Sequence, residues 1–281
     1  TLFPYTTLFR SAAVQSLTYL DHAATTPMRA DAVEAMLPYL SEGFANPSGS
    51  HRFARSARAA IDEARDRVAE CLGCEPGDVV FTSGGTESDN TAVGGVVAVR
   101  GGRPLCSAAE HHAVLEPVEA VGGVVVRTDD SGAVDLGCLE EALRETADVT
   151  LVSVMTVNNE VGTITDLTSV ARIVRSVAPG AALHTDAVQA PCWLDLRDVT
   201  PHVDLLSLSA HKFGGPKGVG VLVTKPGASV APLVVGGGQE RERRSGTHNV
   251  AGIVAMAEAL RLTDAERSSE LPRLAALRDQ L

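Results

Sequence analysis

Short apolar segments alternate with segments of helical periodicity through most of this chain of 281 residues. Apolar runs bounded by turn residues, which are typical of buried strands, occupy residues 78–82, 104–108, 124–128, 149–157 and 181–186. Apolar residues at helical spacing occupy residues 31–40, 53–71, 86–100, 113–121, 136–145 and 167–177. Strands separated by helices of this length form βαβ units. The pattern therefore predicts an α/β fold with a mostly parallel, doubly wound sheet flanked by helices.

The two ends of the sequence do not follow this alternation. The first ten residues carry neither pattern and look like read-through of a sequencing adapter, so we expect residues 1–15 to be non-native or disordered. Residues 16–248 are expected to form one large domain. A helical pattern then runs from residue 249 to the end, and we expect Pro272 to interrupt it and residues 249–281 to begin a second, smaller domain. Because the pattern stops without a cap at Leu281, we expect the chain to be a fragment.

Charge and composition exclude several classes of function. A net charge of −11 and a pI near 5.2 disfavour a surface for nucleic acids or anionic membranes. No run of eighteen apolar residues could form a transmembrane helix. The five cysteines are odd in number and scattered, which favours reduced thiols and a cytoplasmic location.

One lysine stands out in a chain that has three lysines and twenty-one arginines. Lys212 follows the apolar run at residues 203–208, in the stretch S-A-H-K-F-G-G-P-K-G, and a second apolar run starts near residue 218. A desolvated lysine can lose its proton and form a Schiff base with a carbonyl, which arginine cannot do. The alternative is a solvated lysine in a turn. Lys217 is the second candidate, but it lies between proline and glycine and is expected to be too exposed.

Polar residues follow the other predicted strands as well, and two of these segments suit a phosphate and a planar ring. The segment S-G-G-T-E-S contains Gly85 and Thr86 and opens a helix, so its free N–H groups could hold one phosphate, although an ordinary helix start is an alternative. His111 and His112 follow the next strand. Adjacent helical side chains diverge by about 100°, so we expect no shared metal ion and instead a ring that could stack on a planar ligand.

Amide and carboxylate side chains follow the next two predicted strands. Asn159 could orient a polar ligand, the alternative being a plain turn. Asp186 ends a buried strand, with Gln189 three residues later. A carboxylate there must be paired or take part in chemistry, and a cap or a salt bridge to an arginine is the alternative. A Schiff-base lysine, a buried carboxylate, a phosphate cradle and a stacking ring together are the parts that hold pyridoxal 5′-phosphate.

The sequence as a whole resembles a known family, the cysteine desulfurases, which belong to the class V aminotransferases. The resemblance runs from about residue 18 to the C-terminus, and it is carried by D-H-A-A-T-T-P (21–27), F-T-S-G-G-T-E-S-D-N (81–90), E-H-H-A-V-L (110–115), V-N-N-E-V-G (157–162), H-T-D-A-V-Q (184–189), S-A-H-K-F-G-G-P-K-G (209–218) and R-S-G-T (244–247). The last motif, R-S-G-T, resembles that of the IscS/NifS-like branch of the family rather than that of the SufS-like branch. The resemblance implies fold type I of the pyridoxal-phosphate enzymes, with a seven-stranded-type sheet and only the start of a small C-terminal domain.

The resemblance also implies roles for individual residues. Lys212 would carry the cofactor as a Schiff base, Asp186 would pair with the pyridine nitrogen, and His111 would stack on the ring and transfer protons. The remaining predicted contacts are Gln189 to the ring hydroxyl, Asn159 between that hydroxyl and the substrate, and Gly85, Thr86, Ser209 and His211 to the phosphate. Thr247 would reach the phosphate of a second subunit, which implies a homodimer.

The implied reaction converts L-cysteine to L-alanine and an enzyme persulfide that supplies iron–sulfur clusters or tRNA thiolation. A sulfur acceptor or scaffold protein would be the partner of the full-length protein. The family's attacking cysteine, and an arginine that grips the substrate carboxylate, lie beyond Leu281, and none of the five cysteines matches that position. We therefore expect this fragment not to complete desulfuration. The alternatives are another class V enzyme, such as a selenocysteine lyase, and a phosphate-binding module in which Lys212 is only structural.

Overall fold

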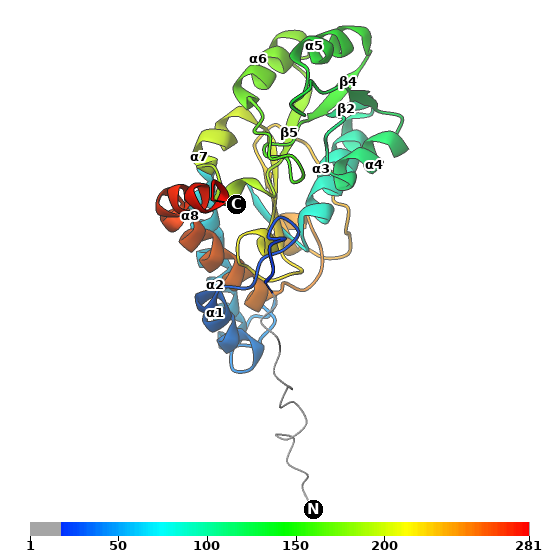
Figure 1. The fold of residues 1–281 in the computed structure, drawn as a ribbon. Coiled ribbons are helices and arrows are strands. Elements are labelled where there is room, and N and C mark those ends of the chain that lie inside the picture. Colours follow the sequence, from blue (N-terminus) through cyan, green and yellow to red (C-terminus); the bar gives the residue numbers. More distant parts are fainter. Residues whose placement is uncertain (1–17, 281) are drawn as a thin grey trace, which may run out of the picture.

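A seven-stranded sheet forms the centre of the computed structural model, which describes residues 18–280 (Figure 1). The strand order is β1-β7-β6-β5-β4-β2-β3. The strands are β1 (Val79–Thr82), β2 (Arg103–Ser107), β3 (Val124–Val126), β4 (Val149–Ser153), β5 (Ala182–Asp186), β6 (Leu205–Ser209) and β7 (Gly220–Thr224). Strand β7 is antiparallel to both of its neighbours, and the other pairs are parallel. The prediction of a mostly parallel sheet is confirmed. The predicted segment 1–15 lies outside the described residues.

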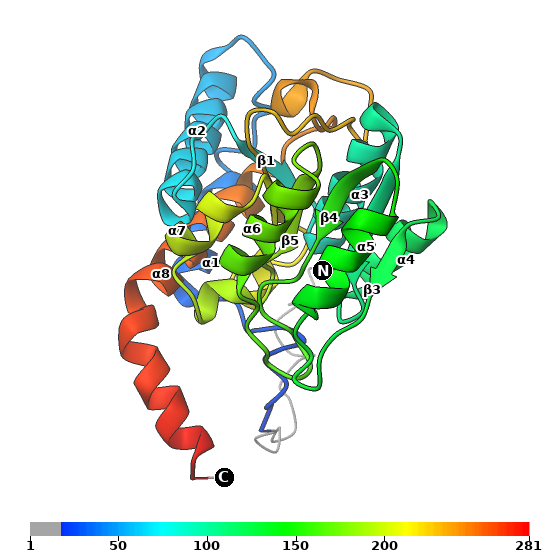
Figure 2. The same ribbon diagram turned by 90° about the horizontal axis from the view of Figure 1, so that it is seen from above.

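Helices cover both faces of the sheet, as the alternating pattern predicts. One face packs against α3 (Gly85–Arg100) and α4 (His112–Ala120). The opposite face is covered by α2 (Arg52–Leu72), α5 (Leu136–Glu145), α6 (Leu167–Val177), α7 (Leu196–Val199) and α8 (Val250–Arg278), and α1 (Ala30–Leu40) packs against α8. Figure 2 shows these layers from above. Central strands buried on both faces have continuous apolar runs, which is why the sequence shows them without alternation.

Three local predictions differ from the structure. Strand β4 ends at Ser153 rather than at residue 157. The backbone of residues 154–156 still follows β5, with Val154 N–H donating to the His184 carbonyl and Thr156 N–H to the Asp186 carbonyl. However, Met155 N–H donates to the Glu110 carboxylate instead of continuing a ladder, so the regular strand ends early.

The other two differences concern helices. Helix α8 runs continuously through Pro272, which is exposed, so the carbonyl that loses its hydrogen bond can be hydrated. Phe53 was expected on the buried face of α2 but is 65% exposed. The buried stripe begins instead at Ala54, which is fully buried, and continues through Ala57 and Ile61, so Phe53 lies beside it. Cys71 is buried, as its place in the pattern predicts.

Helix α8 packs against both α1 and α2, so the first and last helices of the described chain lie side by side. Whether residues 249–281 begin a separate domain stays a prediction. Along residues 18–280, no helix combines the length and the apolar character needed to cross a membrane.

Candidate active site

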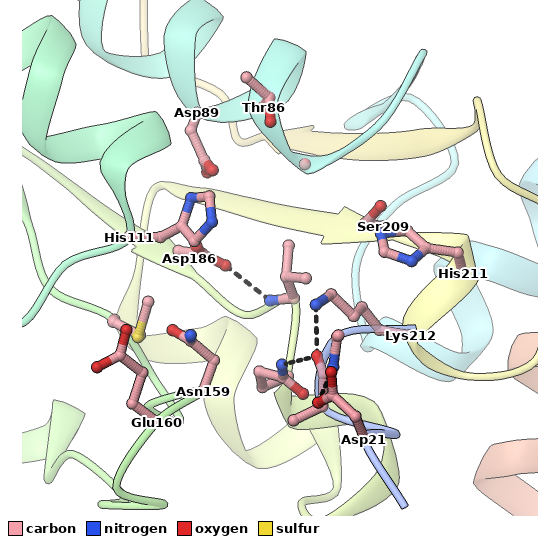
Figure 3. Close-up of a pocket in the computed structure, with 16 residues that line it drawn as sticks. Asp21, Thr86, Asp89, His111, Asn159, Glu160, Asp186, Ser209, His211 and Lys212 are labelled. Atoms are coloured by element: carbon pink, nitrogen blue, oxygen red, sulfur yellow. Dashed lines mark hydrogen bonds between the residues drawn. The ribbon is translucent and has the colours of Figure 1, made fainter. Parts of the chain in front are cut away.

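A cavity of about 540 Å³ opens where β4, β5 and β6 end and α3 begins (Figure 3). This volume lies within the usual range for small-molecule sites. The cavity brings together nine of the ten predicted cofactor-binding residues, which come from five separate segments of the chain: Gly85, Thr86, His111, Asn159, Asp186, Gln189, Ser209, His211 and Lys212. In a mostly parallel sheet the carboxyl ends of the strands share one edge, so side chains that follow different strands converge there.

Lys212 lies in the short 3₁₀ turn that follows β6 and is half-buried. Its Nζ donates to the carbonyl of Ala23 at 2.5 Å. Burial lowers the pKa of Lys212, although the charges of Asp186 and Asp21 oppose this shift. A larger fraction of the amine is therefore neutral and nucleophilic than in an exposed lysine.

The other two lysines do not reach the cavity. Lys217 is exposed, as predicted. Lys225 follows β7 and donates to the carbonyl of Thr200. Neither residue lines the cavity, so within residues 18–280 Lys212 is the lysine placed for chemistry there.

Asp186 ends β5 and is 4% exposed. Its Oδ1 accepts a hydrogen bond from Val188 N–H at 2.8 Å, and it forms no ion pair with any arginine of the described chain. Burial raises the pKa of Asp186, while the hydrogen bond from Val188 and the nearby His111 and Lys212 oppose the shift. The hydrogen bond from Val188 N–H therefore satisfies Oδ1 of Asp186, but the carboxyl group still lines the cavity without an ion-pair partner.

The N-terminus of α3 forms one wall of the cavity. The residue before the helix, Gly84, has a φ of 152°, and its N-cap position makes no side-chain hydrogen bond. The first N–H groups of a helix have no intrahelical acceptor, so they are available to an anion. A side chain at Gly85 would place Cβ 2.8 Å from Val188 Cγ2, which only glycine avoids. Thr86 and Ser209 add hydroxyl groups to the same wall.

Two imidazoles of the cavity are fixed by hydrogen bonds, one to a neighbouring residue and one to a distant segment. The Nδ1 of His111 accepts from Ala113 N–H at 3.0 Å and so caps α4, which leaves Nε2 to carry the ring proton. The Nδ1 of His211 lies 3.1 Å from the hydroxyl of Thr25. Burial lowers the pKa of His211, and the neighbouring charges of Lys212 and Lys217 lower it further. The adjacent ring of His112 is turned 73° from that of His111, with 6.3 Å between the ring centres.

Two amides complete the lining. Gln189 donates to the Ala23 carbonyl at 2.8 Å, so this carbonyl accepts from both Gln189 and Lys212. Asn158 accepts from the N–H groups of Glu160 and Val161, which is the plain turn considered as an alternative. Its neighbour Asn159 lines the cavity instead.

Thr247 lies apart from this cavity. It lines a smaller one of about 120 Å³. Nearby, Arg244 Nε pairs with Glu87 Oε1 at 2.8 Å and so ties this loop to the first turn of α3. The structure therefore does not bring Thr247 to the phosphate cradle of its own chain.

Comparison with known proteins decides the family. Residues 18–276 match the family described as Aminotransferase class-V. The chain belongs to the class V aminotransferases. It is 45% identical over 269 residues to a cysteine desulfurase IscS of Dictyoglomus turgidum, covering 93% of this chain and 67% of that protein.

Solved structures place the chain in the same branch. A NifS-like protein matches with a TM-score of 0.90 and 38% identity, over 94% of this chain and 74% of that one. A structure described as SspA in complex with cysteine matches with a TM-score of 0.81 and 36% identity, over 87% of this chain and 72% of that one. The chain is thus a member of the cysteine desulfurase family, whose enzymes depend on pyridoxal phosphate, and it spans about two thirds of the length of its curated relatives. The predicted family, fold and cofactor are confirmed.

The cavity of this desulfurase chain fits pyridoxal phosphate. It offers a lysine of lowered pKa for the aldehyde, a buried carboxyl without a counter-ion for the ring nitrogen, and an uncapped helix N-terminus for the phosphate. The roles of the individual residues stay predictions.

The motifs left some of the lining without a role. Met155, Glu160, Asp21 and Asp89 also line the cavity. Asp89 is 1% exposed and lies four residues after Gly85 on α3, so helical spacing places both on one face. That spacing could have identified Asp89 from the sequence.

Proposed function

We propose that this chain is the cofactor-binding part of a cysteine desulfurase that converts L-cysteine to L-alanine and passes the sulfur to a thiol. The observation that carries the proposal is the convergence of Lys212, Asp186 and the N-terminus of α3 on one cavity. When bound there, pyridoxal phosphate would supply an electron sink that weakens bonds at the α-carbon of an amino acid.

The chain's own residues would bind and orient the two ligands. The neutral Nζ of Lys212 would form a bond to the aldehyde carbon of the cofactor, and it would afterwards hold or move a proton. Asp186 would keep the ring nitrogen protonated. His111, fixed by its cap on α4, would stack on the ring and move a proton at Nε2. The phosphate would be held by the N–H groups of α3 together with Thr86, Ser209 and His211, while Gln189 and Asn159 would contact the ring hydroxyl.

The sulfur-accepting thiol would come from outside this lining, because none of the five cysteines lines the cavity. In the balanced reaction the Cβ–S bond of cysteine breaks, the sulfur joins the accepting thiol as a persulfide, and Cβ gains a proton to give alanine. In the whole protein the persulfide would supply iron–sulfur clusters or tRNA thiolation through an acceptor or scaffold protein. The five free thiols support a reducing compartment such as the cytoplasm.

Alanine release tests the reaction. Because none of the five cysteines lines the cavity, we expect the chain alone not to complete desulfuration, but dithiothreitol can serve as the accepting thiol. We therefore expect the chain, loaded with pyridoxal phosphate and given L-cysteine and excess dithiothreitol, to release alanine. Cys192 is the control, because its Sγ lies 3.7 Å from the Lys212 carbonyl oxygen. Burial raises the pKa of the Cys192 thiol, which makes it a poor nucleophile. Cys192→Ser should therefore change the rate by less than about twofold, that is, by less than about 0.4 kcal/mol in the barrier.

Two outcomes would contradict the proposal. A loss of more than about tenfold in Cys192→Ser would make Cys192 the sulfur acceptor. Release of alanine from L-selenocysteine but not from L-cysteine would favour the selenocysteine lyase alternative.

A homodimer is the second part of the proposal. Thr247 is exposed and lies outside the cofactor cavity of its own chain. This position supports a contact with the phosphate that is bound to another copy of the chain. We expect equilibrium sedimentation to give twice the chain mass of 29.2 kDa. Loss of a hydrogen bond to a charged group costs about 1.5–3 kcal/mol, so Thr247→Val should weaken pyridoxal phosphate binding by about tenfold or more. The exposed Thr168→Val is the matched control. A monomer at every concentration, with unchanged affinity in Thr247→Val, would refute the dimeric site.

A further inference from the structure

Three carboxyl groups and one imidazole are buried close together, and two of them, Asp89 and Asp186, line the cavity. Asp89 comes from α3, Glu110 follows β2, and His184 and Asp186 lie on the same face of β5 because they are two residues apart on a strand. Their exposed fractions are 1%, 8%, 0% and 4%. In Figure 3 the carboxyl of Asp89 points from α3 into the cavity. The proposed function gives a role to Asp186 alone.

The imidazole cannot neutralise a carboxylate here. The Nδ1 of His184 lies 2.8 Å from the hydroxyl of Ser153, and its Nε2 lies 3.0 Å from that of Ser207. Burial lowers the pKa of His184 to about 3, so the ring is neutral at physiological pH. The distance from Nε2 to Asp89 Oδ1 is 3.6 Å, which is too long for a hydrogen bond. Within residues 18–280 this oxygen has no hydrogen-bond partner.

Electrostatics then decide which carboxyl carries the buried negative charge. Asp186 receives the N–H of Val188 and lies near Lys212. Glu110 accepts from Met155 N–H with Oε1, but burial and the charge of Asp186 raise its pKa to about 8. Burial and the neighbouring carboxyls of Asp186 and Glu110 raise the pKa of Asp89 well above the usual range, although a hydrogen bond from Ser207 opposes this shift. Because several buried like charges are costly, Asp186 is best placed to be the anion.

We propose that Asp89 is held as a neutral carboxylic acid and is a positioning residue for Asp186, which it leaves as the single anion facing the ring nitrogen of the cofactor. The inference rests on the ring-nitrogen role proposed above for Asp186. A charged Asp89 would raise the proton affinity of Asp186 and draw a proton onto that carboxyl. Asp186 would then be neutral and could no longer stabilise a protonated ring nitrogen.

The first experiment uses the protein without cofactor and does not depend on the proposed function. A carboxyl whose pKa is raised on folding favours the folded state fully below its unfolded value of about 3.9, and this contribution is lost as the pH rises towards the folded value. Asp89→Asn does not titrate. We measure the folding equilibrium constants of Asp89→Asn and of the wild type by urea unfolding from pH 5 to 9. The ratio of the variant's constant to that of the wild type should rise by up to about tenfold per pH unit.

The exposed Asp130→Asn is the matched control and should show no such gain. A ratio between Asp89→Asn and wild type that stays constant across this range would mean that Asp89 is ionised throughout, which overturns the proposal. If Asp89→Asn does not fold, Asp89→Ser replaces it. Infrared difference spectra between wild type and variant should also contain the carbonyl stretch of a protonated carboxylic acid, and its absence would refute a neutral Asp89.

The second experiment separates the positioning role from a structural one. With pyridoxal phosphate bound, the absorbance spectra of wild type and Asp89→Asn should agree at pH 7. On raising the pH, the wild type should show an alkaline step, as Asp89 ionises, that Asp89→Asn lacks. Suppose instead that the midpoint of a spectral titration near neutral pH differs by about one pH unit between Asp89→Asn and the wild type. This would overturn the proposal, because removing a charge changes a neighbouring pKa whereas removing a neutral acid does not. Failure to bind the cofactor would refute the proposed function and leave the first experiment valid.

Discussion

Lys212→Ala should leave the protein colourless after incubation with pyridoxal phosphate and removal of unbound cofactor, whereas the wild type should be yellow. The expected change is large because the covalent attachment is lost together with the amine that moves protons. Lys212 is the lysine that lines the cavity, and burial lowers its pKa. Alanine release from L-cysteine should fall by at least about 10³-fold, since positioned acid–base groups contribute 10²–10⁴-fold and the Schiff base adds to this.

Borohydride reduction makes the same prediction at the level of the peptide. Reduction of the loaded wild type, followed by peptide mapping, should place the cofactor on Lys212. Lys217→Ala is the matched control, because Lys217 is exposed and lies in the same turn region. A yellow Lys212→Ala protein, or a label on Lys217 or Lys225, would contradict the assignment of the nucleophile. It would then favour a phosphate-binding module in which Lys212 is structural.

Glu240→Gln should lower the free energy of unfolding by about 3–5 kcal/mol at pH 7, the usual cost of breaking a buried ion pair. Glu240 is 5% exposed and accepts hydrogen bonds from Nη1 and Nη2 of Arg65, from His248 Nε2 and from the backbone N–H of Phe81. The guanidinium of Arg65 also lies 4.6 Å above the Phe81 ring. Glutamine keeps the shape of the side chain but leaves the charge of Arg65 without its partner.

The effect of Glu240→Gln should also depend on pH in a defined direction. Burial would raise the pKa of Glu240, but the hydrogen bonds of His248 and Arg65 outweigh it and hold the pKa at about 2. A pKa lowered on folding stabilises the protein above the unfolded value, near 4.3, and this stabilisation is lost as the pH falls through the folded value. The difference between wild type and variant should therefore shrink between about pH 4.3 and pH 2.

Urea unfolding at several pH values measures this dependence. The exposed Glu242→Gln is the control in the same loop and should stay within about 0.5 kcal/mol of the wild type. An equal loss in both variants would show that the loop, rather than the buried ion pair, is responsible. The backbone at Glu240 and Arg241 has φ of 47° and 58°, in the left-handed region. The ion pair therefore also holds a strained segment, the one that leads to Thr247.

Most of the secondary structure could be predicted from patterns among residues that are close together in the sequence. Helices α5 and α6 begin and end where predicted, because Asp135 and Asp166 cap them and their apolar residues follow a helical period. Prediction failed where a distant group intervened. Strand β4 ends early because the carboxylate of Glu110, 45 residues away in the sequence, takes the N–H of Met155.

The sequence by itself determined the chemistry that this protein can carry: a single well-placed lysine, a carboxyl at a strand end, a glycine-rich helix start and the motifs of a desulfurase. Only the tertiary structure decided which of these groups share a cavity. It places Lys212 on the carbonyl of Ala23, 189 positions away, buries Asp89 beside His184, and leaves Thr247 outside. The physical reason is one of range. Capping and periodicity act between neighbours in the chain, whereas the pairing order of the strands sets which distant segments meet, and burial there sets their protonation.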